Sequence, residues 1–283
     1  MAFSDDERAR LNREYDARAM TASYDKDAIY AARSAAALAR VERIADLVYD
    51  DRSGSTLDLY PAGRGSPLFV WIHGGYWRAS SKDENAFVAP GLVERGISVA
   101  SVDYALAPAV TLDEIVRQVR TAMAWLQRHA PGHGIEAGRL HVGGHSAGGH
   151  LTGMLLAGGW HEAFGVRPDL IATAMPISGL FDLHPLRATF VNDFMVLDAD
   201  GASRNSPTAH LPATSSAMLV AAVGGDESSE FRRQTADYVR SWTARGFPGR
   251  EVPMPGFHHF DIILELERPG NPLFDALHDA IRR

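Results

Sequence analysis

A serine stands at the centre of residues 144–148, whose sequence is Gly-His-Ser-Ala-Gly. An apolar run precedes this segment and a helix-like stretch, residues 147–156, follows it. In that context the pattern is typical of a nucleophile elbow, a sharp strand-to-helix turn in which only small residues fit beside an exposed serine oxygen. Ser146 is therefore the candidate nucleophile. The alternative is a glycine-rich turn in which Ser146 only caps the helix.

A glycine pair follows another apolar run. Residues 73–77, His-Gly-Gly-Tyr-Trp, come directly after the run 68–72. Glycines at the end of a strand leave backbone N–H groups free to face an oxyanion. We expect Gly74 and Gly75 to form an oxyanion hole together with the N–H of Ala147. The alternative is a tight turn that needs only the flexibility of glycine.

A serine hydroxyl is a weak nucleophile, so the chain must also supply a base and a carboxylate that orients it. In one common arrangement these follow the serine in the order acid, then histidine. Asp226 comes just after the apolar run 218–223 and is the predicted acid, with Glu227 as the alternative. Near the C-terminus, His258 and His259 are adjacent. Either of them can serve as the base on this reasoning.

A metal site is a less favoured interpretation of the sequence, and thiol chemistry is excluded. Five histidines crowd one stretch of the chain: His129, His133, His141, His145 and His150. No H-E-x-x-H pattern occurs, and a metal held by these residues would compete with Ser146 for the same place. The sequence contains no cysteine, which excludes disulfides, thiolate metal sites and a cysteine nucleophile. We expect neither a metal nor an organic cofactor, because the candidate nucleophile and its base are both protein side chains.

Several aromatic residues are candidates for the wall of a substrate pocket. Tyr76 and Trp77 follow the glycine pair, whereas Phe181 and Phe190 lie in a long irregular stretch. Core packing explains each of them individually about as well. Asp103 also follows an apolar run, and there we expect it to hold a loop.

The elements that must position these residues alternate along the chain. Two β-type runs, 46–49 and 56–60, flank a turn sequence and predict an antiparallel hairpin. Runs apolar on both faces suit a sheet covered on both sides; they occupy 68–72, 97–102, 140–142, 170–177 and 218–223. Helix-like stretches separate them at 84–95, 112–129, 147–156 and 230–245. This alternation predicts an α/β fold with a mostly parallel sheet and helices on both faces.

The 283 residues show no linker between two cores, so we expect a single domain over 1–283. Residues 1–43 are predicted to be an N-terminal helical extension, and residues 181–211 a cap-like insertion. Nucleic acid is not an expected partner, because the net charge is −7 and no basic run occurs. The acidic N-terminus does not resemble a signal peptide and no apolar stretch is long enough to cross a bilayer, so we expect a cytoplasmic location without membrane contact.

Together these motifs resemble the α/β-hydrolase superfamily and, more narrowly, the arylformamidases of the kynurenine pathway, also called kynurenine formamidases. The resemblance covers most of the chain, from residues 11–15, Leu-Asn-Arg-Glu-Tyr, to the C-terminal histidine loop. The stretches that carry it are 73–77, 103–104 with 111–115, 178–183 with 185–187, and 226–231 with Gln234. At position 105 the chain has alanine where esterases similar to hormone-sensitive lipase usually have arginine, so that broader group is less similar.

The resemblance has implications for the site and the reaction. Residues 259–263, His-Phe-Asp-Ile-Ile, are similar to the family segment in which the catalytic histidine precedes phenylalanine, which implies that His259 is the base. It also implies Asp226 as the acid and Ser146 as the nucleophile. The implied α/β-hydrolase converts N-formylkynurenine to kynurenine and formate.

Other functions stay open beside this one. The first alternative is a small-molecule carboxylesterase with the same triad, and the second is a non-catalytic ligand-binding protein on a hydrolase scaffold. The expected partner is a small aryl formamide or ester, and a homodimer is left open.

Overall fold

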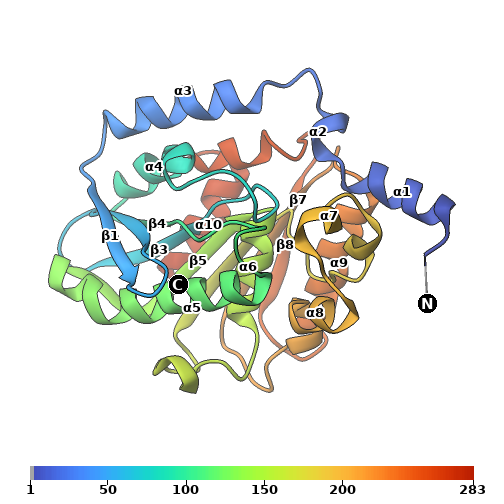
Figure 1. Cartoon of the computed structure of the whole chain (residues 1–283). Helices are drawn as coiled ribbons and strands as arrows, with labels where there is room; N and C mark the ends of the chain where they lie inside the picture. The colour runs from blue at the N-terminus through green and yellow to red at the C-terminus, as the bar shows by residue number, and fades with distance from the viewer. Residues whose placement is uncertain (1–2) are drawn as a thin grey trace.

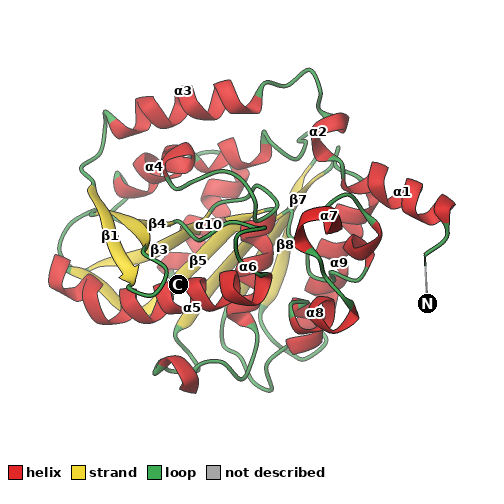
Figure 2. Ribbon diagram, viewed as in Figure 1, coloured by secondary structure: helices red, strands yellow, loops and turns green. Residues whose placement is uncertain are grey.

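A single eight-stranded sheet forms the centre of the molecule (Figures 1 and 2). The computed structural model describes residues 3–283, so the first two residues of the expected N-terminal extension lie outside the described residues. The strand order is β1-β2-β4-β3-β5-β6-β7-β8. The strands are β1 Ile44–Asp50, β2 Ser55–Tyr60, β3 Ser66–Ile72, β4 Ser98–Val102, β5 Ile135–His145, β6 Ile171–Ile177, β7 Met218–Gly224 and β8 Gly249–Met254.

The sheet is antiparallel at one edge and parallel over the rest. β1 pairs with β2, and β2 with β4, in antiparallel register, whereas β4, β3, β5, β6, β7 and β8 run parallel to their neighbours. The predicted fold class, including the N-terminal hairpin, is therefore confirmed. The loops that follow β3, β5, β7 and β8 leave the sheet at the same edge, where active sites of open α/β sheets collect.

Helices cover both faces of this sheet (Figure 1). On one face α5 Leu112–His129, α6 Ala147–Leu156 and α9 Ser229–Thr243 pack into one apolar core. On the other face α4 Ala89–Val93 and α10 Pro272–Arg282 pack into a second core. The sheet thus carries a separate apolar layer on each side, as the doubly apolar strands require.

Two helical assignments differ from the sequence expectation. The stretch 84–95 is a 3-10 turn, η1 Asp83–Val88, followed by the short helix α4. Pro90 lacks the N–H needed for a regular helical bond, so a continuous helix does not form there. Helix α10 had no counterpart in the sequence analysis, although Leu273, Phe274 and Leu277 bury an apolar face at helical spacing.

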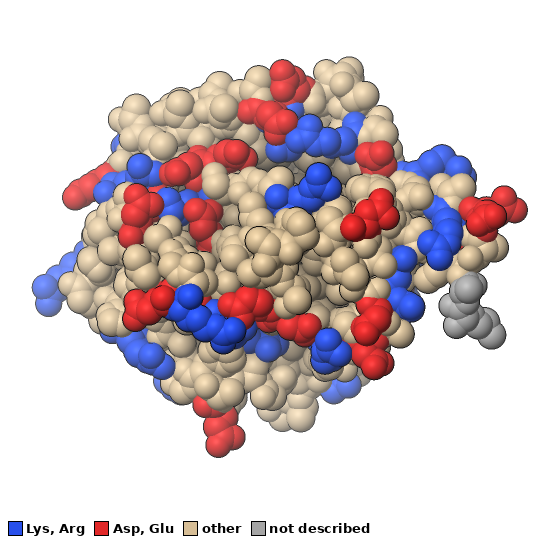
Figure 3. Space-filling model, in the orientation of Figure 1, with Lys and Arg blue, Asp and Glu red and all other residues tan. Residues whose placement is uncertain are grey.

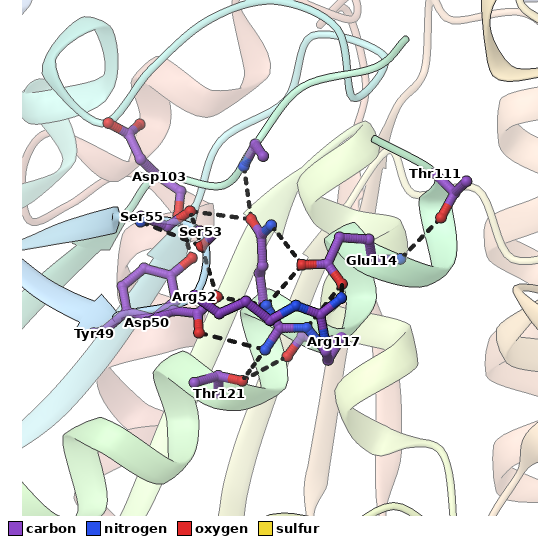
Figure 4. Close-up of polar contacts among 12 residues, drawn as sticks. Tyr49, Asp50, Arg52, Ser53, Ser55, Asp103, Thr111, Glu114, Arg117 and Thr121 are labelled. Atoms are coloured by element: carbon purple, nitrogen blue, oxygen red, sulfur yellow. Dashed lines mark hydrogen bonds and ion pairs between the residues drawn. The ribbon is translucent and has the colours of Figure 1, made fainter. Parts of the chain in front are cut away.

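A polar network fixes the β1-β2 hairpin to the start of α5 (Figure 4). Arg117 of α5 forms ion pairs with Asp50 at the end of β1 and with Glu114 one turn earlier. Asp103 follows β4, and its carboxylate accepts a 2.6 Å hydrogen bond from the backbone N–H of Lys82. Asp103 therefore holds a loop, as predicted. That loop is the one that begins at the glycine pair after β3.

Helical segments at two places in the chain border the carboxyl edge of the sheet. Residues 3–43 contain α1 Asp5–Tyr15, α2 Ala17–Met20 and α3 Lys26–Leu38. Residues 181–211 contain η4 Pro185–Ala188, α7 Asn192–Met195, α8 Ala199–Arg204 and η5 Pro207–His210. Helix α1 packs on η4 and α9, and α3 packs on η1. The single-domain assignment stays a prediction.

Two further features, a membrane-spanning helix and a cluster of metal ligands, are absent from residues 3–283. None of the helices there combines the length and apolarity that a bilayer crossing requires. The same residues hold no group of three or more histidine, aspartate or glutamate side chains arranged for a metal ion.

Candidate active site

Ser146 stands at the sharp turn between β5 and α6. Its backbone has φ 55° and ψ −114°, a region that costs a non-glycine residue conformational energy. Two hydrogen bonds hold this conformation. The Ser146 N–H donates to the carbonyl of Ile177 over 2.8 Å, and the Ser146 carbonyl accepts from the N–H of His150 over 2.9 Å. The strained serine is thus fixed by the neighbouring strand and by its own helix.

The glycines around Ser146 are required by backbone contact. A Cβ added at Gly148 would lie 2.0 Å from the carbonyl oxygen of Ile72, and one added at Gly144 would lie 2.5 Å from the carbonyl oxygen of Gly148. Neither oxygen can move without breaking β3 or the elbow itself. The sequence analysis expected small residues at 144–148 because the turn leaves little room beside the serine, and the structure adds that the end of β3 occupies the space beside Gly148.

The carboxylate beside His259 belongs to Glu227, which corrects the expectation that Asp226 lies there. The Glu227 Oε2 atom lies 2.6 Å from Nδ1 of His259, and the Glu227 side chain is fully buried. Its other oxygen accepts a 2.8 Å bond from the N–H of Gly224 and a 2.5 Å bond from the hydroxyl of Ser178. Asp226 is exposed. Among residues 3–283 its carboxylate has no hydrogen-bond or ion-pair partner, and its backbone N–H donates to the carbonyl of Phe257.

The reason for this correction lies in the turn after β7. The strand ends at Gly224, and the Gly224 N–H that no longer pairs in the sheet binds the Glu227 carboxylate three residues later. This contact turns Glu227 inward and leaves the preceding residue on the solvent side. Sequence placed the carboxylate at the end of β7 but did not give the direction of the turn.

His259 lies in the loop after β8 and lines the same cavity as Ser146. Because Nδ1–H donates to the Glu227 carboxylate, Nε2 is left as the proton acceptor. His258 does not share this arrangement. Its Nδ1 accepts the backbone N–H groups of Phe260 and Asp261, which closes the loop.

The expected oxyanion donors lie beside the serine. A Cβ added at Gly74 would lie 3.3 Å from Cβ of Ser146, so the glycine backbone passes directly against the nucleophile. Gly75 has φ 103°, a conformation that favours glycine. Within the described part of the chain, the N–H groups of Gly74, Gly75 and Ala147 have no hydrogen-bond acceptor. Three free amides are thus available near Ser146.

A second imidazole packs beside His259. The ring of His145 lies 4.6 Å from that of His259, centroid to centroid, and His145 is almost fully buried. Burial lowers the pKa of His145 well below its ordinary value, with the neighbouring His259 adding to the effect. His145 is therefore neutral and does not compete for the Glu227 carboxylate. The sequence analysis placed this residue in the elbow and among the five clustered histidines, but did not predict its contact with His259.

The site opens into a cavity of about 330 Å³, within the range of small-molecule pockets. Of the four aromatic residues predicted to line it, Tyr76 and Phe190 do, and their rings meet edge to face at 5.9 Å. Trp77 and Phe181 do not line it, which corrects those two predictions. Trp77 is fully buried with its Nε1 donating to His150, and Phe181 stacks on Tyr238 in the core.

Several cavity residues were missed by the sequence analysis. The aromatic residues Phe194, Phe260 and Tyr30 line the cavity, as do the cations Arg18, Lys26 and Arg78. Most come from short helices and loops far from the motifs. Arg78 and Phe260 adjoin motif residues, but the motifs gave them no role. No local pattern marks the other four, because their place depends on how α2, α3 and residues 181–211 fold over the sheet edge.

Comparison with known proteins places these features in context. The family model BD-FAE matches residues 57–165. Kynurenine formamidase of Salmo salar is 34% identical over 234 residues, which cover 80% of this chain and 77% of that protein. Kynurenine formamidase of Drosophila melanogaster is 27% identical over 215 residues, which cover 71% of this chain and 68% of that protein.

Solved structures share the architecture. A protein of Silicibacter sp., assigned as a thioesterase, has a TM-score of 0.79 and 31% identity and covers 95% of this chain and 98% of its own. Esterase B of Lactobacillus rhamnosis, in an inhibited form, has a TM-score of 0.69 and 19% identity, covering 98% of this chain and 95% of its own. The second likeness concerns the fold alone.

Proposed function

Because the chain belongs to the kynurenine formamidase family, we propose that this serine hydrolase converts N-formylkynurenine and water to kynurenine and formate. One observation supports the proposal more than any other. His259, hydrogen-bonded to the buried Glu227, lines a cavity together with a strained serine and the glycines Gly74 and Gly75, whose backbone amides are free. That set contains each part needed for acyl transfer to a serine.

The first half of the reaction forms a formyl-enzyme. Ser146 Oγ attacks the formyl carbon while His259 Nε2 takes the hydroxyl proton. The oxyanion that develops accepts hydrogen bonds from the N–H groups of Gly74, Gly75 and Ala147. The carbon–nitrogen bond then breaks, and the His259 proton goes to the departing aryl amine, which leaves as kynurenine. Glu227 stabilises the imidazolium between the two proton transfers.

The second half returns the enzyme to its starting state. His259 takes a proton from water, and the resulting hydroxide attacks the formyl carbon of the Ser146 ester. The same amides hold the new oxyanion. The ester bond breaks, and His259 returns the proton to Ser146 Oγ. Formic acid leaves and releases its remaining proton to water, which gives formate. No external oxidant, reductant or cofactor enters this sequence.

The shape of the cavity suits such a substrate. A formyl carbon carries only hydrogen, so the acyl side needs little room near Gly74 and His145. The aryl amine needs a broad apolar surface, which Tyr76, Phe190 and Phe194 provide.

The test is a direct comparison of substrates. We expect a higher kcat/KM for N-formylkynurenine than for p-nitrophenyl acetate or butyrate. Hydrolysis of N-formylkynurenine is measured by the release of kynurenine. A fluorophosphonate probe should label the wild-type protein at Ser146 and leave Ser146→Ala unlabelled. Labelling without formamide hydrolysis would reject the proposed substrate, and no labelling would favour a binding protein.

A carboxylesterase is the second candidate. The esterase-like fold neighbours are compatible with it, and the same triad cleaves esters. A higher kcat/KM for the p-nitrophenyl esters than for the formamide would favour this function.

Two further expectations stay predictions. Cell fractionation tests the cytoplasmic location, and light scattering of the purified protein tests the homodimer.

A further inference from the structure

Among residues 3–283, three cationic side chains line the cavity, and only two of them form ion pairs with a carboxylate. Arg18 and Lys26 both bind the carboxylate of Asp27, at 2.9 and 2.6 Å. Arg78 lines the cavity without a carboxylate at ion-pair distance anywhere in residues 3–283. An arginine in a ligand pocket whose charge is not neutralised by the protein is available to an anionic ligand.

The Arg78 guanidinium is held in place by its surroundings. It lies over the ring of Phe194 at 4.6 Å from the ring centroid, an arrangement that restrains the planar fork without using its hydrogen-bond donors. Its backbone N–H donates over 3.0 Å to the carbonyl of Gly75. The cation is therefore attached to the same loop as the expected oxyanion donors.

Depth separates this cation from the reacting groups. Arg78 is exposed, whereas Ser146 and His259 are each only 3% exposed. Aromatic rings of Tyr76, Phe190 and Phe194 line the same cavity. The cavity thus has the reacting groups at its buried end, aromatic rings along its wall and a cation at its open end. A matching ligand has an acyl group at the buried end, an aromatic body, and an anion at the open end.

The overall electrostatics make a local anchor necessary. The chain carries a net charge of −7, which repels anions at long range. On the face seen in Figure 3, acidic and basic residues are interspersed and neither sign forms a continuous patch. Selection of an anion thus depends on individual side chains within the cavity.

We propose that Arg78 is the specificity residue that selects substrates carrying a carboxylate at the end remote from the scissile acyl bond. A carboxylate matches the guanidinium fork in a two-point hydrogen bond. The inference rests on the proposed function for the identity of the substrate, where the group bound is the α-carboxylate of N-formylkynurenine.

The experiment compares two formamides that differ in that group. N-formylkynuramine keeps the aryl formamide and the amine but lacks the carboxylate. We expect wild-type kcat/KM to be about tenfold to hundredfold higher for N-formylkynurenine, the range typical of one charge-assisted contact. Arg78→Gln should remove most of this ratio, mainly through the KM of N-formylkynurenine.

Three other variants sharpen the result. Arg78→Lys keeps the charge without the fork and should recover part of the preference. Arg167→Gln removes a surface arginine paired with Asp169 and serves as the matched control, with the ratio unchanged. Loss of the ratio in Arg18→Gln instead of Arg78→Gln would assign the anchor to the paired arginine and overturn the proposal.

Failure of the inference is distinguishable from failure of the proposed function. An equal loss on both formamides in Arg78→Gln, or no loss on either, overturns the inference while formamide hydrolysis stands. If the wild-type protein cleaves neither formamide, the same variants are assayed on 3-(4-acetoxyphenyl)propanoate and its methyl ester. A preference for the anionic ester that depends on Arg78 supports the inference, and its absence overturns it.

Discussion

The groups at the ends of the strands and the wall of the cavity are built in different ways. Around Ser146, backbone contacts leave no freedom, because a Cβ at Gly144 or Gly148 would collide with carbonyl oxygens. The wall consists of side chains from loops and short helices, such as Phe190 in the turn before α7 and Phe194 within α7, which pack at the edge of the core. We infer that the strand ends determine the reaction and the wall determines which molecule undergoes it.

This difference predicts a division in the kinetics. Substitutions at the strand ends should lower kcat, whereas substitutions in the wall should raise KM. The substitutions below test that division in order of expected effect.

The largest effect is expected for the nucleophile and the base. Ser146→Ala and His259→Ala should each lower kcat by about 10⁴-fold or more, since triad residues act as one unit. The measurement is steady-state kinetics on the preferred substrate. His258→Ala is the control, because His258 binds backbone N–H groups in its own loop and not the Glu227 carboxylate. A larger loss in His258→Ala than in His259→Ala would contradict the assignment of the base.

A smaller effect is expected at Ser178, whose hydroxyl donates to Glu227. Ser178→Ala should lower kcat about tenfold to hundredfold with little change in KM, because a hydrogen bond to a charged group contributes about 1.5–3 kcal/mol. Ser206→Ala is the matched control. That buried serine donates to Ala202 away from the triad, so its loss should lower stability and leave kcat near the wild-type value. An unchanged kcat in Ser178→Ala would remove Ser178 as a positioning residue.

His150 links the loop after β3 to residues 181–211, and its protonation should lower the stability of the folded chain. Its Nδ1 accepts from Trp77 and its Nε2 donates to the carbonyl of Asn205, so the buried ring is neutral. Burial lowers the pKa of His150 to about 4 from 6.5. The unfolded chain therefore binds a proton below about pH 6.5 that the folded chain rejects, and stability falls as the pH decreases toward 4.

The size of this effect follows from the two pKa values. Between pH 7.5 and 5, His150 should account for a loss of about 2 kcal/mol in the free energy of unfolding. Denaturant titrations of wild type and His150→Gln at both pH values give the difference, in which other groups cancel. Equal losses in the two proteins would contradict the neutral assignment.

The smallest effect is expected in the wall. Phe190→Ala should raise KM about tenfold, near 1.4 kcal/mol, and change kcat by less than about threefold. Phe164→Ala is the control, since that partly buried phenylalanine packs on Trp160 outside the cavity. A fall in kcat without a change in KM for Phe190→Ala would break the division between the two regions.

The same difference explains how far sequence could predict the molecule. The sheet and the elbow were predictable, because apolar runs and crowded glycines record contacts of the local backbone. The choice between Asp226 and Glu227 as the partner of His259 was not predictable, since a shift of one residue in a turn reverses the direction of the side chain. Trp77 and Phe181 were misassigned because an aromatic residue beside a site motif can point into the core as readily as into the cavity.

The central claim is that Glu227, through His259, activates Ser146. The most direct measurement is kcat for Glu227→Gln beside Asp226→Asn, on the preferred substrate and with folding checked by circular dichroism. We expect Glu227→Gln to lose about 10³- to 10⁴-fold, because an amide stabilises the wrong tautomer of the histidine, and Asp226→Asn to lose less than about threefold. A large loss in Asp226→Asn with near wild-type kcat in Glu227→Gln would contradict the account.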